Sequence, residues 1–294
     1  MDESLHKAGF VSIIGKPNVG KSTLMNKLTG ERLSIITSKA QTTRHRIMGI
    51  ISGDDFQVVY SDTPGMLKPA YELQSSMMQF VNSALEDADI VLLVTDFFDS
   101  YDEVILTKLK RLSQPIILVV NKIDLDKGGQ TESKIEDWKS KLDFKEIIPV
   151  SALLGTGVEA VFQKILELLP THPAFFPKDS LTDKPEKFFA SEIVREKIFT
   201  NYKKEVPYST EVEIETFQED DTIIHIRALI YVERRSQKGI IIGHKGASLK
   251  KVGTEARIDM EAFFQKKIFL ETYVKVAEDW RKKSRSLKGF GYKN

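Results

Sequence analysis

The chain of 294 residues is long enough for two domains, and its 41% hydrophobic and 29% charged residues are ordinary for a globular protein with buried cores. It has no cysteine, which excludes disulfides and cysteine-based zinc sites, and its apolar runs fall far short of the roughly 20 residues that span a bilayer. The net charge of +1 hides an excess of basic residues at one end, because residues 222–294 carry 17 Lys and Arg against 7 Asp and Glu. No signal peptide is visible at the amino terminus, and the lack of cysteine is compatible with a reducing cytoplasm. We expect the basic carboxy-terminal end to meet an anionic partner.

Strands and helices alternate along residues 1–172. Continuous apolar segments at 9–15, 89–96, 115–122 and 146–150 predict buried strands, and segments 46–52 and 56–62 predict a strand pair around a turn. Helical spacing follows from about residue 21 and over 70–86, 102–112, 131–142 and 157–169. This alternation predicts an α/β domain in which helices cover both faces of a mostly parallel sheet.

A proline-rich segment separates this domain from a different pattern. Residues 170–185 contain four prolines, so we predict a linker over residues 173–187. Beyond it we expect a helix at 188–203, two antiparallel strands at 209–217 and 222–232, a helix ending near residue 265, a strand at 267–276 and a terminal helix. Residues 188–294 are therefore predicted to form a smaller α+β domain.

A glycine loop follows the first strand and opens the first helix. The segment GKPNVGKS has two glycines separated by four residues and followed by Lys and Ser, which is the phosphate-loop pattern in its required context. Its backbone N–H groups and helix amino terminus favour phosphate oxygens, Lys21 can reach the terminal phosphates, and the Ser22 hydroxyl can ligate magnesium. The predicted nucleotide-binding residues here are Gly15, Lys16, Pro17, Asn18, Val19, Gly20, Lys21, Ser22 and Thr23.

Three further segments lie at the ends of predicted strands, where such sheets bind ligands. DTPG offers a carboxylate that can hold magnesium and an amide that can contact a terminal phosphate. NKID offers an Asp for the ring N–H and amine of guanine, which adenine does not present together, so an ATPase or kinase is disfavoured. SAL offers backbone amides for the guanine oxygen. The corresponding predicted residues are Asp62, Thr63, Pro64, Gly65, Met66, Asn121, Lys122, Asp124, Ser151, Ala152 and Leu153.

These four segments resemble those of the translation-factor-like GTPases. The resemblance implies that KAQTTRHR at 39–46 is the first switch and that Thr43, with Thr42 as the alternative, closes on magnesium together with Ser22 and Asp62. Small GTPases usually have a glutamine after the DTPG glycine, whereas this chain has Met66, which cannot orient water. The subgroup with an apolar residue there often carries an asparagine at the place of Asn18 that helps to bind potassium. The predicted catalytic residues are Lys21, Asn18, Thr43 and Gly65.

A second glycine loop, GHKG, lies between apolar residues and a long predicted helix. It matches the Gly-x-x-Gly turn of KH domains, which clamps about four nucleotides of a single strand. Three isoleucines would form an apolar groove beside the bases, inside a positive field. The predicted RNA-binding residues are Arg234, Arg235, Lys238, Ile240, Ile241, Ile242, Gly243, His244, Lys245, Gly246, Lys250 and Lys251. The basic, aromatic segment 280–294 either extends this surface or is a frayed tail.

A GTP-binding domain followed by a type II KH domain resembles the Era family of bacterial ribosome-biogenesis GTPases over almost the whole chain. The resemblance implies GTP or GDP with Mg²⁺ as ligands and binding near the 3′ end of small-subunit 16S ribosomal RNA in 30S subunit assembly. It also implies a cytoplasmic monomer, part of which associates peripherally with the inner membrane. The alternative is a GTP-dependent scaffold whose KH-like domain binds a protein or a membrane surface.

Overall fold

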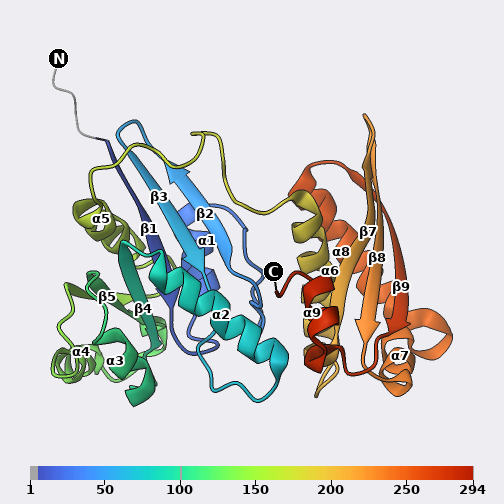
Figure 1. Cartoon of the computed structure of the whole chain (residues 1–294), viewed down its shortest axis with the longest axis horizontal. Helices are drawn as coiled ribbons and strands as arrows, with labels where there is room; N and C mark the ends of the chain where they lie inside the picture. Colours follow the sequence, from blue (N-terminus) through green and yellow to red (C-terminus); the bar gives the residue numbers. More distant parts are fainter. Residues whose placement is uncertain (1–5, 100, 294) are drawn as a thin grey trace. The chain divides into compact units, whose positions relative to one another are not determined.

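The computed structural model describes residues 6–99 and 101–293. The chain divides into two compact units (Figure 1). The first contains the residues up to 68 together with 77–183, and the second contains 69–76 together with the residues from 184 onward. Each unit is described by itself.

The first unit is built on a six-stranded sheet of order β2-β3-β1-β4-β5-β6. Its strands are β1 (Lys7–Ile14), β2 (Ile47–Ser52), β3 (Phe56–Asp62), β4 (Ile90–Asp96), β5 (Ile116–Asn121) and β6 (Glu146–Val150). All neighbours pair in parallel except β2 and β3, which are antiparallel. Because β1, β3, β4 and β5 are parallel, the phosphate loop, DTPG and NKID all emerge at one edge of the sheet.

Helices cover both faces of this sheet (Figure 1). Side chains of α2 (Glu72–Glu86), α3 (Glu103–Leu109) and α4 (Thr131–Lys139) share one core with β1, β4 and β5. Helices α1 (Lys21–Thr29) and α5 (Val158–Leu168) pack against each other, and α1 also contacts β1, β2 and β3. The predicted fold class is thereby confirmed for this unit.

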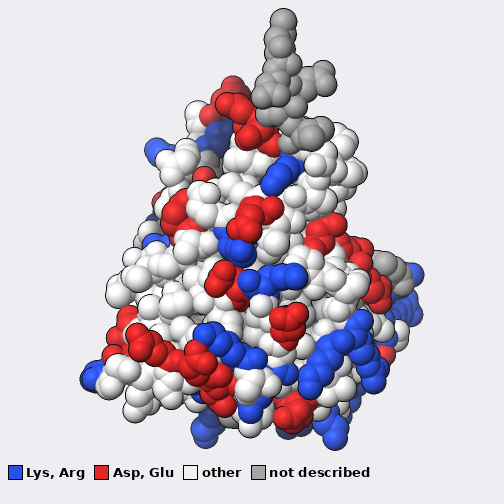
Figure 2. Space-filling view, turned by 90° about the vertical axis from the view of Figure 1, so that its left-hand side faces the viewer, with Lys and Arg blue, Asp and Glu red and all other residues white. Residues whose placement is uncertain are grey.

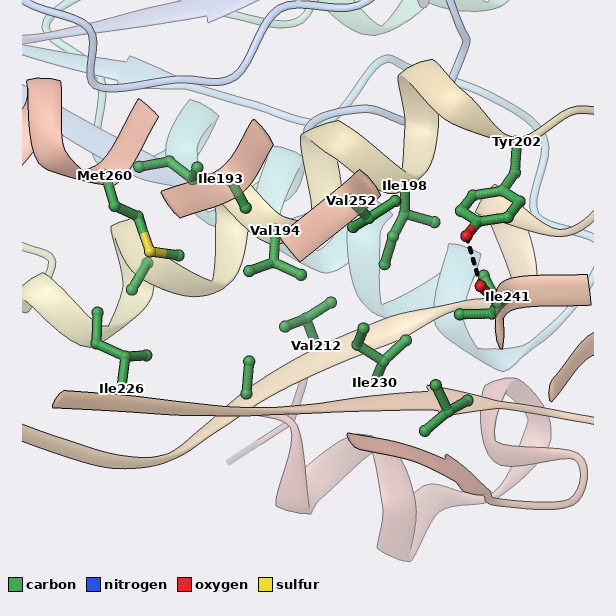
Figure 3. Packing of buried hydrophobic residues seen from close by; sticks show 14 of the residues in the cluster. Ile193, Val194, Ile198, Tyr202, Val212, Ile226, Ile230, Ile241, Val252 and Met260 are labelled. Atoms are coloured by element: carbon green, nitrogen blue, oxygen red, sulfur yellow. Dashed lines mark hydrogen bonds between the residues drawn. The ribbon is translucent and has the colours of Figure 1, made fainter. Parts of the chain in front are cut away.

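The second unit has a three-stranded sheet of order β7-β8-β9, formed by β7 (Glu211–Glu219), β8 (Ile223–Val232) and β9 (Lys267–Val276). Strand β7 pairs with β8 in an antiparallel manner and β8 pairs with β9 in parallel. Helices α6 (Glu186–Asn201), α7 (Arg235–Ile242) and α8 (Ala247–Phe264) contribute side chains to a single apolar core over this sheet (Figure 3). The predicted order of helix, two antiparallel strands, long helix and strand is confirmed, and the short helix α7 precedes the long helix α8.

Much of the predicted linker packs on the first unit. The side chain of Gln57 on β3 accepts the N–H groups of Phe175 at 2.7 Å and Phe176 at 3.0 Å, and it donates to the Phe176 carbonyl at 2.8 Å. The ring of Phe175 lies 4.7 Å from that of Phe10, and the Thr182 hydroxyl donates to the Met48 carbonyl at 2.6 Å. Prolines prevent helix and strand here, but they do not prevent packing.

The carboxy-terminal segment is folded rather than frayed. It forms two short helices, η4 (Trp280–Lys282) and α9 (Ser284–Gly289). Trp280, Leu287 and Tyr292 are buried, the Trp280 indole N–H donates to the Ser209 carbonyl at 2.9 Å, and the Tyr292 hydroxyl donates to Glu211 at 2.6 Å. The two shorter helices therefore belong to the second unit.

Charged side chains of both signs are mixed on one face of the molecule. Figure 2 shows a face on which Lys and Arg alternate with Asp and Glu in mixed groups. Among residues 6–99 and 101–293, no helix combines the length and apolar character needed to cross a membrane.

Candidate nucleotide site and nucleic-acid interface

The phosphate loop joins β1 to α1 through backbone conformations that favour glycine. Gly15 has φ +149° and Gly20 has φ +97°. A Cβ at Gly15 would lie 2.2 Å from the Val94 carbonyl oxygen, and a Cβ at Gly20 would lie 2.2 Å from Nδ2 of Asn121. Both glycines are therefore required by close approach as well as by φ, and the loop is held against β4 and β5.

Lys21 is the first residue of α1, and its side chain is buried beneath the loop. Its ammonium donates to the Lys16 carbonyl at 2.8 Å. Burial lowers the pKa of Lys21 from 10.5 to about 8, although the nearby Asp62 carboxylate acts in the opposite direction. A buried cation with one carbonyl partner is poised to meet an anionic ligand such as a phosphate.

Three oxygens from distant segments converge beside Lys21. The Ser22 hydroxyl donates to Oδ2 of Asp62 at 2.6 Å and lies 2.9 Å from the Thr43 hydroxyl, which is itself 3.5 Å from Oδ2 of Asp62. Thr42 turns away, because its hydroxyl lies 2.6 Å from that of Thr37 and donates to the Lys39 carbonyl. Of the two alternatives in the first switch, the structure brings Thr43 to the predicted metal ligands.

Asp62 is a buried carboxylate with Lys21 nearby and one oxygen that accepts no hydrogen bond from the described residues. It is fully buried, and its Oδ1 has no hydrogen-bond partner among the described residues. Burial raises the pKa of Asp62, and the hydrogen bond from Ser22 only partly opposes that shift. Carboxylate and hydroxyl oxygens are the ligands that Mg²⁺ takes beside substrate phosphates, so this set fits the ion.

A cavity of about 360 Å³ opens over these groups. Residues of the phosphate loop, the first switch, Gly65 and Lys122 line it. The prediction from the sequence missed the part of the lining that precedes residue 39, where no motif marks the chain. These additional residues are Ile35, Ile36, Thr37 and Ser38. Asn18 also faces this segment, since its amide donates to the Ser38 carbonyl at 3.2 Å.

The DTPG segment lies directly against the phosphate loop. A Cβ at Gly65 would come within 2.6 Å of the backbone N and Cα of Pro17, and the Met66 N–H donates to the Gly15 carbonyl at 2.9 Å. The Met66 side chain packs on the core beneath α2 rather than entering the site. The Thr63 hydroxyl donates to the Ile13 carbonyl at 2.7 Å, so its side chain serves the backbone of β1.

The predicted base-recognition residues form a connected set. Asn121 donates to the Val19 carbonyl at 2.8 Å and accepts the Ala152 N–H at 2.9 Å, which ties NKID to both the phosphate loop and SAL. The Ser151 hydroxyl donates to Asp124 at 2.5 Å and thereby fixes that carboxylate.

Lys122 spans the space between NKID and the phosphate loop. Its ammonium donates to the Asn18 carbonyl at 2.8 Å and pairs with Asp96, which the prediction from the sequence did not include. Leu153 remains 70% exposed beside this set, as an apolar surface open to a planar ring.

In the second unit, the GHKG turn joins α7 to α8 through left-handed backbone. Gly243 has φ +71°, Gly246 has φ +81°, and Lys245 between them has φ +47°. A Cβ at Gly243 would lie 2.1 Å from the Ser248 hydroxyl oxygen, whereas a Cβ at Gly246 would meet nothing within 4 Å. His244 and Lys245 are exposed at the tip, where backbone and side chain can both approach a phosphate.

The isoleucine groove is only partly as predicted. Residues 240–242 lie on α7, and a helix turns consecutive residues by about 100°, so the three side chains cannot share one face. Ile240 is half exposed and Ile242 half buried, but Ile241 is fully buried in the core. The inclusion of Ile241 in an open apolar groove is therefore wrong.

Basic side chains lie on both helices that the turn joins, on the start of α7 and on the first turns of α8. Arg234, Arg235, Lys250 and Lys251 are exposed and Lys238 is half-buried. The folded tail adds the exposed residues Lys282, Lys283, Arg285 and Lys288. Because β8 and β9 are parallel, α7 and the tail leave the same end of the sheet, and the Ala277 N–H donates to the Val232 carbonyl at 2.8 Å where they do so.

Comparison with protein families divides the chain in the same way. Residues 10–122 match the family described as 50S ribosome-binding GTPase, and residues 205–281 match the KH domain family. The two matches cover the nucleotide site up to NKID and the whole GHKG region.

The similarity to individual relatives covers nearly the full chain. The GTPase Era of Geobacter metallireducens is 43% identical, with 99% of this chain and 100% of the relative covered. A crystal structure of Era in complex with MgGDPNP and nucleotides 1506–1542 of 16S ribosomal RNA is 39% identical, with a TM-score of 0.92 and coverage of 98% of this chain and 100% of that one. An Aquifex aeolicus Era variant bound to GDP and AlF4⁻ is 38% identical, with a TM-score of 0.93 and the same coverage.

Proposed function

Since the chain belongs to the Era family of GTPases, we propose that it hydrolyses GTP and binds small-subunit ribosomal RNA near its 3′ end during assembly of the 30S subunit. The observation that carries the first part is the convergence of Ser22, Thr43 and Asp62 beside the buried Lys21. The second part is supported by the solved Era complex with nucleotides 1506–1542 of 16S ribosomal RNA and by the exposed GHKG turn.

In the nucleotide site, the proposed roles combine the positions described above with the chemistry of each group. Backbone amides of residues 15–22 surround the phosphates, and Lys21 neutralises the charge that develops on the terminal group. Ser22, Thr43 and Asp62 hold Mg²⁺, which when bound balances the negative charge of the β- and γ-phosphates. The Gly65 amide contacts the terminal phosphate and responds to its loss.

Guanine selectivity is assigned to Asp124, whose carboxylate is fixed by Ser151 and is left unpaired by adenine. The Ala152 amide meets the guanine oxygen, and Lys122 and Leu153 flank the ring. A thermal-unfolding screen with GTP, GDP, ATP and ADP tests this assignment. We expect a rise in Tm with the guanine nucleotides alone, and equal protection by ATP would contradict the assignment.

Because Met66 packs away from the site, the water-orienting group of small GTPases has no counterpart at that position. We propose that potassium, bound with the help of Asn18, supplies positive charge at the transition state. Hydrolysis rates are measured in KCl and in NaCl at equal ionic strength. A faster reaction in KCl that is lost in Asn18→Ala supports this role, and equal rates in both salts exclude it.

We further propose that the nucleotide state of the first unit controls the RNA affinity of the second. GTP with Mg²⁺ orders residues 39–46 and 62–67, and this ordering favours the RNA-competent state. RNA titrations in GDP and in a non-hydrolysable GTP analogue measure the coupling. The same affinity with both nucleotides would show that the two sites are independent.

RNA binding itself is best tested at the tip of the GHKG turn. The change Gly243→Asp would also collide with Ser248, so it confounds folding with binding. The double variant His244→Asp/Lys245→Asp is sharper, since both residues are exposed and Asp tolerates the left-handed backbone at position 245. We expect it to keep GTP hydrolysis and Tm but to lose most of its affinity for single-stranded RNA, because two carboxylates would face the phosphates.

Peripheral membrane association, a cytoplasmic location and a monomeric state complete the proposal. The rival is a GTP-dependent scaffold in which the second unit binds a protein or an anionic membrane. Vesicle flotation with and without anionic lipid, beside the RNA titration, separates the two. Strong vesicle binding with no affinity for RNA would favour the scaffold.

A further inference from the structure

A buried tyrosine supports the GHKG turn from the side of the core. Tyr202 directly follows α6 as its C-cap residue, and its ring is buried among the apolar side chains of the second unit. Its hydroxyl donates to the carbonyl of Ile241 at 2.6 Å (Figure 3). Tyr202 and Ile241 are 39 residues apart in sequence, so this bond joins two segments that only the fold brings together.

The acceptor, the Ile241 carbonyl, lies in the last turn of α7, directly before the GHKG turn. α7 ends at Ile242, one residue after Ile241, and the carbonyls of a last helical turn have no donor further along the same helix. The Tyr202 hydroxyl therefore caps the carboxy-terminal end of α7. Gly243 follows directly, and its N–H donates to the Gly239 carbonyl at 2.9 Å.

The opposite end of α7 is fixed in a comparable way. The Gln237 side chain accepts the N–H groups of Glu233 at 3.0 Å and Arg234 at 2.9 Å. With both ends of α7 held by buried side chains, the start of the GHKG turn is defined before any ligand arrives. The turn itself then needs the unfavourable φ of +47° at Lys245, which persists only where its surroundings impose it.

We propose that Tyr202 is a positioning residue for the RNA-binding turn: its hydroxyl holds the end of α7 so that Gly243–Gly246 presents its backbone in the binding conformation. Tyr202 touches no RNA in this proposal, because its ring is buried and on the core side of α7. Pre-organised binding loops lose less freedom on binding, so a loosened turn binds more weakly. The proposal rests on the proposed RNA binding of the second unit.

The test compares Tyr202→Phe with Tyr292→Phe in the full-length chain. Each substitution removes one buried hydroxyl whose hydrogen bond measures 2.6 Å in the second unit, but that of Tyr292 bonds Glu211 on β7 rather than α7. Both variants should therefore lose stability. Only Tyr202→Phe should also weaken RNA binding, by about 3- to 10-fold, as the loss of one net hydrogen bond implies.

Three readouts are needed. Tm reports folding, titration with a single-stranded RNA oligonucleotide reports affinity, and hydrogen exchange reports protection of the amides of Gly243 and Gly246. We expect faster exchange at these amides in Tyr202→Phe alone, together with unchanged GTP hydrolysis. Equal RNA affinity in Tyr202→Phe and the parent, or equal weakening in both variants, would overturn the proposal. If the parent itself fails to bind RNA, the proposed function fails, and unchanged exchange at the turn would then separately refute the positioning role.

Discussion

The close approach of DTPG to the phosphate loop gives the sharpest prediction. In Gly65→Ala the new methyl would lie 2.6 Å from two backbone atoms of Pro17 and 2.7 Å from its Cγ, distances that real Cβ atoms do not show. Gly65 does not have positive φ, so the cost is steric rather than conformational. Overpacking of this kind costs about 1–3 kcal/mol, and relief requires the two segments to separate by almost an ångström.

Because the Gly65 amide is proposed to meet the terminal phosphate, that separation should lower single-turnover GTP hydrolysis by up to about a hundredfold. Tm should fall by several degrees, as roughly 2–4 °C per kcal/mol is expected for a unit of this size. Gly253→Ala on α8 is the control, because its new methyl meets only two atoms of Thr272 on β9, at 3.8 and 3.9 Å. Parental hydrolysis and parental Tm in Gly65→Ala would refute the described contact.

Three further predictions concern other parts of the molecule. Thr43→Ala should lower Mg²⁺-dependent GTP hydrolysis by about 10- to 150-fold, because an interaction with a charged group is worth about 1.5–3 kcal/mol. Thr42→Ala should lower it less, and the opposite order would show that Thr42 rather than Thr43 is the metal ligand of the first switch. Burial raises the pKa of Tyr202 from 10.0 to about 12, so between these values the unfolded chain loses a proton that the folded chain keeps. Stability should then fall as pH rises through this range, and Tyr202→Phe should flatten that part of the curve in urea titrations at several pH values. The double variant Arg285→Gln/Lys288→Gln should reduce the slope of log affinity against log salt for single-stranded RNA by about 1.4, because each phosphate contact contributes about 0.7. An unchanged slope would show that these two residues of the tail do not contact RNA.

Most of the fold could be predicted because hydrophobic periodicity and glycine motifs are local. The strand predicted at 267–276 has the observed bounds of β9, and the helix predicted at 188–203 is displaced by only two residues. The sequence also placed the nucleotide motifs at the ends of strands, since each follows an apolar run directly. These strands, helices and motifs could be predicted because each depends on residues that are close together in the sequence.

The parts that the sequence did not predict depend on contacts between distant segments. Ile241 looked like its neighbours in an apolar run, and only the position of α7 over the core decides that it points inward. The packing of Phe175 on Phe10 and the cap that Tyr202 places on Ile241 have no local signal either. The same holds for residues 35–38, which line the cavity although no motif marks them in the sequence.

The contact between Gly20 and Asn121 has a consequence for how such a chain can diverge. Gly20 belongs to the loop proposed to bind the phosphates and Asn121 to the segment proposed to recognise the base, and a Cβ at Gly20 would lie 2.2 Å from Nδ2 of Asn121. A substitution at Gly20 is therefore tolerated only if residue 121 becomes smaller. An alignment of the family should show positions 20 and 121 either both unchanged or substituted together.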